Sequence, residues 1–184
     1  MGASQSRLRL VAPVREPADA GEPLDFDGVF RRYAPYVAAI GLRLLGAADE
    51  VDELVQDVFL DAHRTFGTLR DRGAVRGWLA AIAVRKAQRR LRRRRLRAWL
   101  GMTIPIAYGD AIDPGATPQD RLLLGSVYRV LDRLPAEQRI AWTLRYVEGE
   151  QLETVATLCD CSLATAKRRI AAAHAKVEEV VRDA

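Results

Sequence analysis

Hydrophobic positions along this chain recur at every third and fourth residue, the period of amphipathic helices that are buried on one face. The clearest run lies between residues 48 and 66, and its apolar positions are Val51, Leu54, Val55, Val58, Phe59 and Ala62. Similar runs occupy residues 24–45, 121–134 and 135–147. Because no segment has the pattern of a convincing strand, we predict an all-α fold.

Two stretches rich in proline and glycine interrupt the helical pattern. Residues 1–23 have little periodicity, and we expect a flexible leader there. Residues 98–119 contain three prolines, three glycines and few charges, which is typical of a flexible linker. The chain therefore divides into two small helical domains, at 24–97 and 120–184.

One proline falls inside the first helical segment. Pro35 lacks a backbone N–H and suits the first turn of a helix, where no donor is needed. We therefore expect the segment from residue 24 to Gly46 to form two helices, with the second beginning at Pro35.

The charge of the chain is concentrated in one run. The sequence has 29 basic and 24 acidic residues, but nine of the basic ones lie at positions 85–97, where there is no acid. A dense positive helix of this kind neutralises phosphates and releases counterions, which favours a nucleic-acid contact. A solvated basic helix, a disordered polybasic segment or, less favoured, a membrane-surface helix would also fit this composition.

The helix expected at residues 48–66 has an acidic face. Six carboxylates precede its first basic residue, Arg64: Asp49, Glu50, Asp52, Glu53, Asp57 and Asp61. Such a face is either a solvated surface or a docking surface for a basic protein partner. The glycine- and arginine-containing stretch 67–77 that follows is expected to be a loop between the acidic and the basic helix.

The last 34 residues predict a helix-turn-helix. A short helix at 151–158 is followed by a tight turn, Cys159 to Ser162, and by a second helix that Ser162 caps and that runs to about residue 181. We expect Asp160 to take a left-handed conformation in this turn. In this motif the first turns of the second helix face DNA. An ordinary helical hairpin is the alternative.

Other chemistry finds little support in the sequence. Cys159 and Cys161 cannot be completed to a tetrahedral zinc site, and we expect them to pack in the turn. His63 and His174 are far apart in sequence and have no nucleophile motif near them. No apolar run approaches the length of a membrane span, and two cysteines fit a reducing compartment. We therefore expect no catalytic residues, metal or cofactor, no membrane insertion, and a cytoplasmic protein.

Three segments together resemble the extracytoplasmic-function (ECF) group of the sigma-70 family of bacterial RNA polymerase sigma factors. Residues 52–66 resemble the polymerase-binding helix of region 2, and residues 77–95 resemble the helix that meets the −10 promoter element. Residues 131–170 resemble region 4, which binds the −35 element. The order of these segments and the linker between them fit that group.

The resemblance implies a function without covalent chemistry. The protein would bind core RNA polymerase, recognise both promoter elements in DNA and direct transcription initiation. An anti-sigma factor is a further partner to expect, because many members of the group are held inactive by one.

The resemblance also implies three groups of site residues. Those for core polymerase are Asp52, Glu53, Leu54, Gln56, Asp57 and Phe59. Those for the −10 element are Trp78, Arg85, Lys86, Arg89, Arg90, Arg92 and Arg93, although the group usually has an Asn in place of Arg85 and an acid in place of Arg89. Those for the −35 element are Ser162, Thr165, Lys167, Arg168 and Arg169.

Two other functions remain open on the sequence alone. A stand-alone helix-turn-helix regulator would bind duplex DNA as a dimer without polymerase. An RNA-binding or membrane-surface adaptor would use only the basic run, and residues 120–184 would then be dispensable.

Overall fold

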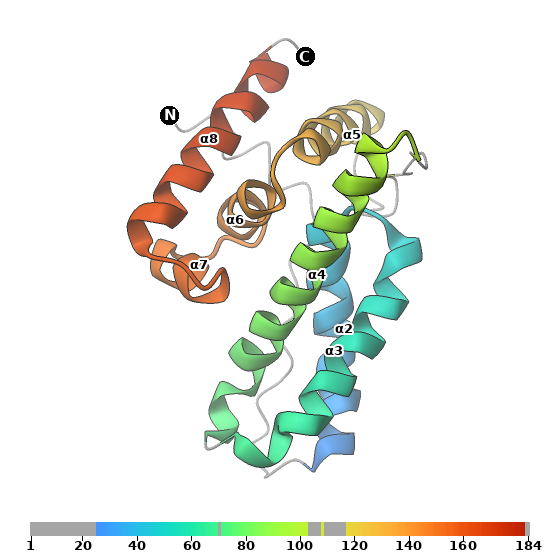
Figure 1. Cartoon of the computed structure of the whole chain (residues 1–184), viewed down its shortest axis with the longest axis vertical. Coiled ribbons are helices and arrows are strands. Elements are labelled where there is room, and N and C mark those ends of the chain that lie inside the picture. Colours follow the sequence, from blue (N-terminus) through green and yellow to red (C-terminus); the bar gives the residue numbers. More distant parts are fainter. Residues whose placement is uncertain (1–24, 70, 103–107, 109–116, 183–184) are drawn as a thin grey trace.

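The computed structural model describes residues 25–69, 71–102, 108 and 117–182, and over these residues it is helical with no strand (Figure 1). The predicted all-α class is therefore confirmed. The helices are α2 (Phe26–Leu45), α3 (Val51–Thr65), α4 (Val75–Trp99), α5 (Pro118–Arg133), α6 (Ala136–Tyr146), α7 (Leu152–Leu158) and α8 (Leu163–Arg182). Short 3-10 turns lie at Ala48–Glu50, Phe66–Thr68 and Arg72–Ala74. The expected leader, 1–23, and most of the expected linker lie outside the described residues.

Helices α2, α3 and α4 pack side by side as a three-helix bundle (Figure 1). The prediction of a helix break at Pro35 was wrong, because α2 runs through this residue without interruption. A proline inside a helix costs about 3 kcal/mol. Here Pro35 lies on the exposed side, while Val37, Ile40 and Leu44 on the other side are almost fully buried against the bundle. Burial of that face offsets the lost hydrogen bond.

The connection between α3 and α4 is shorter than the sequence suggested. We expected a loop over 67–77, but α4 already begins at Val75 and includes Gly77. Val75 and Leu79 are buried, so the first turn of α4 is anchored in the core. The Asp71 carboxylate accepts a hydrogen bond from the Gly73 backbone N–H at 2.8 Å and stabilises the turn before the helix.

The helix-turn-helix forms as predicted. Asp160 has a φ of +48°, the left-handed conformation expected for the turn. The Ser162 hydroxyl accepts a hydrogen bond from the Thr165 backbone N–H at 3.2 Å, which caps the start of α8. At the other end of this half, Thr117 and Asp120 form a reciprocal capping box that fixes the start of α5.

The two halves of the chain pack against each other, although the sequence left their arrangement open. Helix α6 contacts both α2 and α4, and α7 also contacts α4. The largest hydrophobic core contains Leu79 and Ala83 of α4 together with Ile140 and Leu144 of α6. A second, smaller core around Trp142 lies between α5, α6 and α8. In the described arrangement, the region resembling the −10-binding domain and the helix-turn-helix half therefore share one core.

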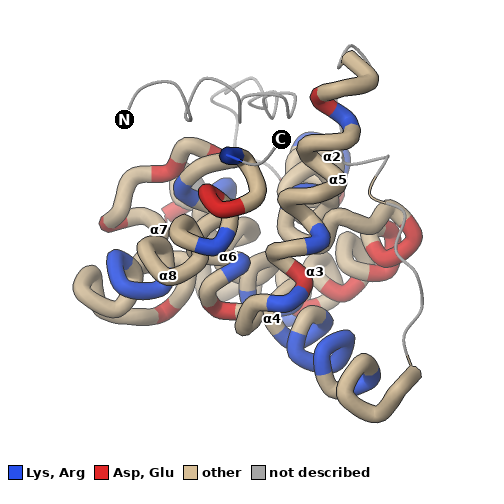
Figure 2. The backbone as a smooth tube through the Cα atoms, turned by 90° about the horizontal axis from the view of Figure 1, so that it is seen from above, with Lys and Arg blue, Asp and Glu red and all other residues tan. Residues whose placement is uncertain are grey.

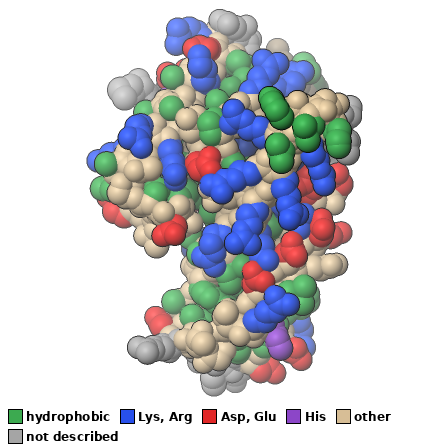
Figure 3. Space-filling model, in the orientation of Figure 1, with side chains coloured by type: hydrophobic (Ala, Val, Ile, Leu, Met, Phe, Trp, Pro, Cys, Tyr) green, Lys and Arg blue, Asp and Glu red, His purple; other side chains and the backbone are tan. Residues whose placement is uncertain are grey.

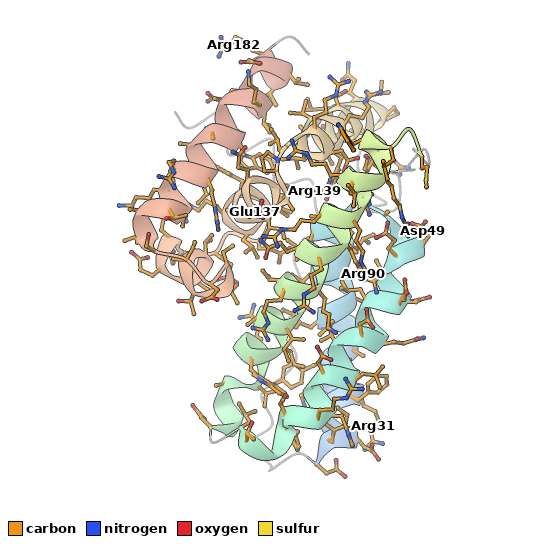
Figure 4. All side chains as sticks on the ribbon, viewed as in Figure 1. Arg31, Asp49, Arg90, Glu137, Arg139 and Arg182 are labelled. Atoms are coloured by element: carbon orange, nitrogen blue, oxygen red, sulfur yellow. The ribbon has the colours of Figure 1, made fainter. Side chains whose placement is uncertain are left out.

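A buried arginine joins the halves at the end of α2. The Arg139 side chain, 1% exposed, donates from Nε to the Leu44 carbonyl at 2.9 Å and from a terminal nitrogen to the Leu45 carbonyl at 2.7 Å. It also bonds Asp132 and is labelled in Figure 4, where it points from α6 toward α2 and α4. The last carbonyls of a helix have no partner within it and carry its negative dipole end, so a cation is favourable there.

Two further contacts surround this docking point. A terminal nitrogen of Arg43 lies 2.9 Å from both carboxylate oxygens of Glu148, with both side chains 7% exposed. The Tyr128 hydroxyl donates to the Arg43 carbonyl at 3.1 Å. Gly46 follows α2 at a φ of +68°, and an added Cβ would come within 2.8 Å of the Tyr128 ring. Only glycine therefore permits both the left-handed end of α2 and the close approach of α5.

Candidate nucleic-acid and protein interfaces

The basic residues of α4 fall into rows that face different neighbours. Side chains three or four positions apart lie on the same side of a helix. One row faces α3, a second faces α6, and a third faces solvent, while Ala87 and Leu91 point into the core. Figure 2 shows lysine and arginine positions following one another along the outer end of α4. What each cation can bind therefore depends on its row.

The row that faces α3 is already paired with carboxylates. The pairs and their shortest separations are Lys86 with Asp61 at 2.7 Å, Arg90 with Glu53 at 2.7 Å and with Asp57 at 2.6 Å, and Arg94 with Glu50 at 2.8 Å. Figure 4 shows Arg90 directed toward α3. Four of the six carboxylates of the acidic face that the sequence suggested as a docking surface are thus paired with α4.

The ion pairs between α3 and α4 shift the pKa values of Asp61 and Arg90. The hydrogen bond from Lys86 lowers the pKa of Asp61 below its ordinary value. Burial by itself lowers the pKa of Arg90, but its hydrogen bonds to Glu53 and Asp57 outweigh that effect, so the pKa is raised. Both shifts favour the charged forms of the pairs at neutral pH.

The row that faces α6 meets one glutamate. The Glu137 carboxylate accepts from Arg92 Nε at 2.8 Å and from the Gln88 side-chain amide at 3.3 Å. Burial alone raises the pKa of Glu137, but its own backbone N–H at the start of α6 and the Arg92 guanidinium outweigh it and lower the pKa. Glu137, in the helix-turn-helix half, therefore forms an ion pair with Arg92, a residue that the family resemblance assigned to the −10 element.

The solvent-facing row consists of Arg85, Arg89 and Arg93, all exposed. No carboxylate among the described residues forms an ion pair with any of them. Their spacing of four residues places three guanidinium groups along one side of the helix, as a phosphate backbone requires. Trp78 lies at the other end of α4, half-buried, with its ring 6.3 Å from that of Phe66.

The outer face of α3 differs from its prediction in two residues. Leu54 is fully buried and Phe59 is 5% exposed, so these two side chains support the helix from within. Asp52, Glu53 and Gln56 are exposed. The sequence analysis missed Leu60, which is 58% exposed. Its position four residues after Gln56, in line with the polar row, was the signal that could have identified it.

The second helix of the helix-turn-helix presents its predicted residues as a short basic surface. Lys167 and Arg168 are exposed, and Arg169 is half-buried. The Ser162 and Thr165 hydroxyls lie 2.9 Å apart at the helix start. The start of α8 and the residue before it therefore offer cations and hydroxyl groups together, a suitable set for phosphate and base contacts.

The turn cysteines lie partly inside the protein, and burial raises the pKa of Cys159 to about 12. A thiol with so high a pKa is a poor nucleophile and metal ligand. Among the described residues, no group of three or more His, Cys, Asp or Glu side chains could hold a metal ion. No helix in the described part combines the length and apolar content that a bilayer span needs.

Comparison with protein families finds two matches, in the order expected. Residues 29–97 match sigma-70 region 2, and residues 124–177 match sigma-70 region 4. Among curated proteins, the chain is 30% identical to the ECF RNA polymerase sigma factor SigM of Mycobacterium tuberculosis, over 88% of this chain and 80% of the relative. It is 29% identical to the ECF RNA polymerase sigma-E factor of Escherichia coli K12, over 90% and 91%.

Solved structures show the same likeness. The sigma factor RpoE, in complex with the anti-sigma factor NepR from Bartonella quintana, superposes with a TM-score of 0.63 at 26% identity. The match covers 86% of this chain and 97% of RpoE. CnrH, in complex with the cytosolic domain of CnrY, has the same fold, with a TM-score of 0.56 at 22% identity over 86% and 88% of the two chains.

Proposed function

This chain belongs to the ECF group of the sigma-70 family of RNA polymerase sigma factors, and from that membership we propose how its residues bind polymerase and promoter. Its function is to bind core RNA polymerase, recognise the −10 and −35 promoter elements and direct transcription initiation. The observation that carries this conclusion is the presence of region 2 and region 4, in that order, in one chain. Sigma factors are regulators rather than enzymes, and we assign no catalytic residue.

We assign one promoter element to each half. Residues 24–97 form the domain for core polymerase and the −10 element, residues 120–184 form the domain for the −35 element, and residues 98–119 link them. The match of residues 29–97 to region 2 and of residues 124–177 to region 4 supports this division.

At the −10 element, we propose that Arg85, Arg89 and Arg93 grip phosphates. Their exposure, and the absence of an ion pair to any of them within the described residues, support this role. Lys86 and Arg90 are held by α3 and are assigned to positioning α4, and Arg92, 60% exposed, would exchange its bond to Glu137 for a phosphate. Trp78 lies near the start of α4, and we assign it to contact the opened DNA strand at that end of the helix.

At the −35 element, we propose that the first turns of α8 enter the major groove. Lys167 and Arg168 would reach base edges or phosphates, and Ser162, Thr165 and Arg169 would contact the DNA backbone.

Replacing Lys167 or Arg168 by alanine is expected to weaken −35-dependent initiation by about 1–3 kcal/mol for a residue that reaches bases. Run-off transcription from promoters with an intact and a mutated −35 element would measure this. Unchanged promoter preference in both variants would exclude base recognition by these residues, and Arg182→Ala, at the far end of α8, is the control.

For core polymerase, we propose the outer face of α3, with Asp52, Glu53, Gln56, Asp57 and the newly identified Leu60. Glu53 and Asp57 bond Arg90 but are still 72% and 42% exposed, so a partner can reach them as well. The side chains of Leu54 and Phe59 are buried, so we assign them to packing α3 against the bundle and not to contacting the partner.

The double variant Gln56→Arg, Leu60→Arg is expected to weaken binding to core polymerase by about 2 kcal/mol or more, the scale of a hot spot. Both side chains are exposed, so the fold should survive. Affinity is measured with labelled protein and purified core enzyme. The double variant Thr157→Arg, Ala175→Arg, at exposed positions of α7 and α8, adds the same two charges elsewhere and is the control. Core binding equal to that of the parent protein would remove this face from the interface.

The stand-alone regulator is not favoured, because a regulator of that kind has no use for a region 2 domain. Run-off transcription with purified core polymerase and a library of promoter fragments separates the two functions. A sigma factor gives protein-dependent start sites that share two motifs at a fixed spacing. A stand-alone regulator shifts duplex DNA without polymerase and yields no new starts.

We propose an anti-sigma factor as a further partner. The solved structures of RpoE and CnrH that share this fold contain NepR and the cytosolic domain of CnrY, respectively. Co-purification of the tagged chain from its native host, followed by loss of transcription when the captured protein is added back, tests this expectation.

A further inference from the structure

The last turns of α4 expose large apolar side chains to solvent. Trp99 is 81% exposed, and Leu96 and Leu100 are each more than half exposed. We call these three residues the apolar tip. Large hydrophobic side chains that are exposed together, as opposed to singly, indicate an interaction site. Figure 3 shows hydrophobic side chains gathered among lysines and arginines where α4 ends.

The apolar tip continues the solvent-facing row of arginines. Leu96 follows Arg93 by three residues and Leu100 follows Leu96 by four, so these side chains lie on the same side of the helix. Trp99, three residues after Leu96, lies beside them. The surface from Arg85 to Leu100 is about 22 Å long at the rise of an α-helix. One side of α4 therefore changes from cationic to apolar along its length.

The surroundings of the apolar tip are positively charged. The sequence has no acidic residue at positions 72–109. Arg95 and Arg97, which line a groove between α4 and α5, are exposed and form no ion pair within the described residues. Glu50, in the turn before α3, is bound by Arg94 at 2.8 Å. A partner of the tip therefore needs apolar groups next to negative charges.

We propose that the apolar tip and the solvent-facing arginines bind the surface of an anionic phospholipid membrane. Phospholipids place phosphate groups directly beside acyl chains, which matches cations beside apolar side chains. Tryptophan is enriched at this level of a bilayer, and arginine reaches the headgroups while its stem lies on apolar groups. Binding of such a surface grows with the apolar area that is buried and with attraction to anionic lipids. The contact is peripheral and involves one leaflet.

Other occupants fit these observations less well. A DNA backbone offers phosphates to the arginines but no apolar surface to Leu96 and Leu100. A protein partner would need an acidic pocket for Trp99, because Figure 2 shows the end of α4 extending beyond the neighbouring helices. The membrane-surface helix considered from the sequence needed a wide apolar face, but Val84 and Leu91 are buried in the core. Apolar contact with a membrane is therefore confined to the tip.

Membrane binding would compete with promoter binding, a consequence that rests on the proposed function. Lipid headgroups and DNA both present phosphates to Arg85, Arg89 and Arg93. Because one side of a helix cannot contact both at once, anionic lipid would reduce the share of the protein that is available for initiation. By linkage, bound DNA would lower the affinity for lipid by the same factor.

The test uses the full chain and two kinds of vesicle, phosphatidylcholine alone and an equal mixture of phosphatidylcholine and phosphatidylglycerol. Co-sedimentation measures binding. The tip variant is Leu96→Gln, Trp99→Gln. Its matched control is Phe30→Gln, Leu122→Gln, which also replaces one aromatic residue and one leucine at exposed positions. A third variant, Arg85→Gln, Arg89→Gln, Arg93→Gln, removes the cations and is compared with Arg133→Gln, Lys176→Gln, Arg182→Gln.

We expect the parent to bind the mixed vesicles at least about tenfold more tightly than phosphatidylcholine vesicles. The tip variant should bind the mixed vesicles about tenfold more weakly than the parent, and its control should stay within about threefold. Loss of the three solvent-facing arginines should weaken binding by about 100-fold, because each cation near an anionic membrane strengthens binding by about fivefold. Circular dichroism confirms that every variant is folded.

Three results would overturn the membrane proposal. The first is equal binding of the parent to both kinds of vesicle, and the second is equal binding of the tip variant and its control to the mixed vesicles. The third is a tip variant that keeps its vesicle binding but loses affinity for core polymerase, which would assign the tip to a protein interface.

Run-off transcription with added vesicles separates the two levels. Inhibition of the parent by mixed vesicles, but not of the tip variant, supports the competition with promoter DNA. Vesicle binding without inhibition would refute that competition and leave the membrane site standing. A parent protein that starts no transcription even without vesicles would instead refute the proposed function.

Discussion

Replacing Arg139 by methionine is expected to destabilise the packing of the two halves by about 3–5 kcal/mol, the cost of breaking a buried charged contact. Methionine retains much of the volume but leaves the Leu44 carbonyl without its donor. The Leu45 carbonyl and the Asp132 carboxylate also lose their bonds to Arg139 and keep only their contacts with Arg94. For a protein of this size, such a loss lowers the melting temperature by about 6–20 °C. Thermal unfolding followed by circular dichroism measures the change.

Two control variants locate the cause. Arg92→Met removes an arginine that is 60% exposed and bound to one carboxylate, so it should cost no more than about 1 kcal/mol. Arg139→Lys keeps the charge but cannot reach three acceptors with a planar fork, so its stability should lie between those of the parent and Arg139→Met. Small-angle scattering reports whether the halves separate. A melting temperature for Arg139→Met equal to that of Arg92→Met would show that Arg139 does not hold the interface.

The second large effect is expected on promoter binding. The triple variant Arg85→Gln, Arg89→Gln, Arg93→Gln removes the solvent-facing row of α4 without touching any ion pair described above. Three lost phosphate contacts should lower the slope of log binding constant against log salt concentration by about 2–3. We expect promoter affinity of the polymerase holoenzyme to fall by about 10–100-fold at moderate salt.

The matched control removes three charges elsewhere. Arg133→Gln, Lys176→Gln, Arg182→Gln changes the net charge equally, at exposed positions of α5 and α8. Filter binding of both holoenzymes to one promoter over a salt series makes the comparison. Equal slopes for the two triple variants would mean that overall charge, and not this row, determines the affinity.

The paired row of α4 gives a contrasting expectation. Arg90 has a side chain only 14% exposed and bonds two carboxylates of α3, so its loss should affect the fold before it affects DNA. We therefore expect mutations of neighbouring arginines in this run to have different effects, because their side chains face different elements.

Much of the fold could be predicted from the sequence, because local signals determine it. Apolar spacing placed the helices, and the Ser162 cap and the left-handed Asp160 were correct in detail. The break expected at Pro35 was wrong, because packing of the opposite face of α2 outweighed the local preference. The loop expected over 67–77 was too long for the same reason, since buried Val75 already belongs to α4.

The sequence indicated which types of surface the protein has, but not how the residues of these surfaces pair with one another. The basic run, the acidic helix and the helix-turn-helix were all visible as patterns of charge and spacing. Which cation meets which acid was not, since Arg90 and Asp57 are 33 residues apart and Arg92 and Glu137 are 45 apart. The sequence analysis wrongly counted Leu54 and Phe59 among the residues that contact polymerase, because the sequence does not show which side of α3 packs against the bundle.

The sequence by itself determined what depends on neighbours along the chain: the helices, their caps, the turn of the helix-turn-helix and the concentration of charge. Only the tertiary structure decided which arginines remain available, that Arg139 closes the end of α2 from 95 residues away, and that α4 and α5 enclose a groove. The physical reason is that helix periodicity and capping act over three or four residues. Contacts between distant segments depend on how all the apolar faces are buried together.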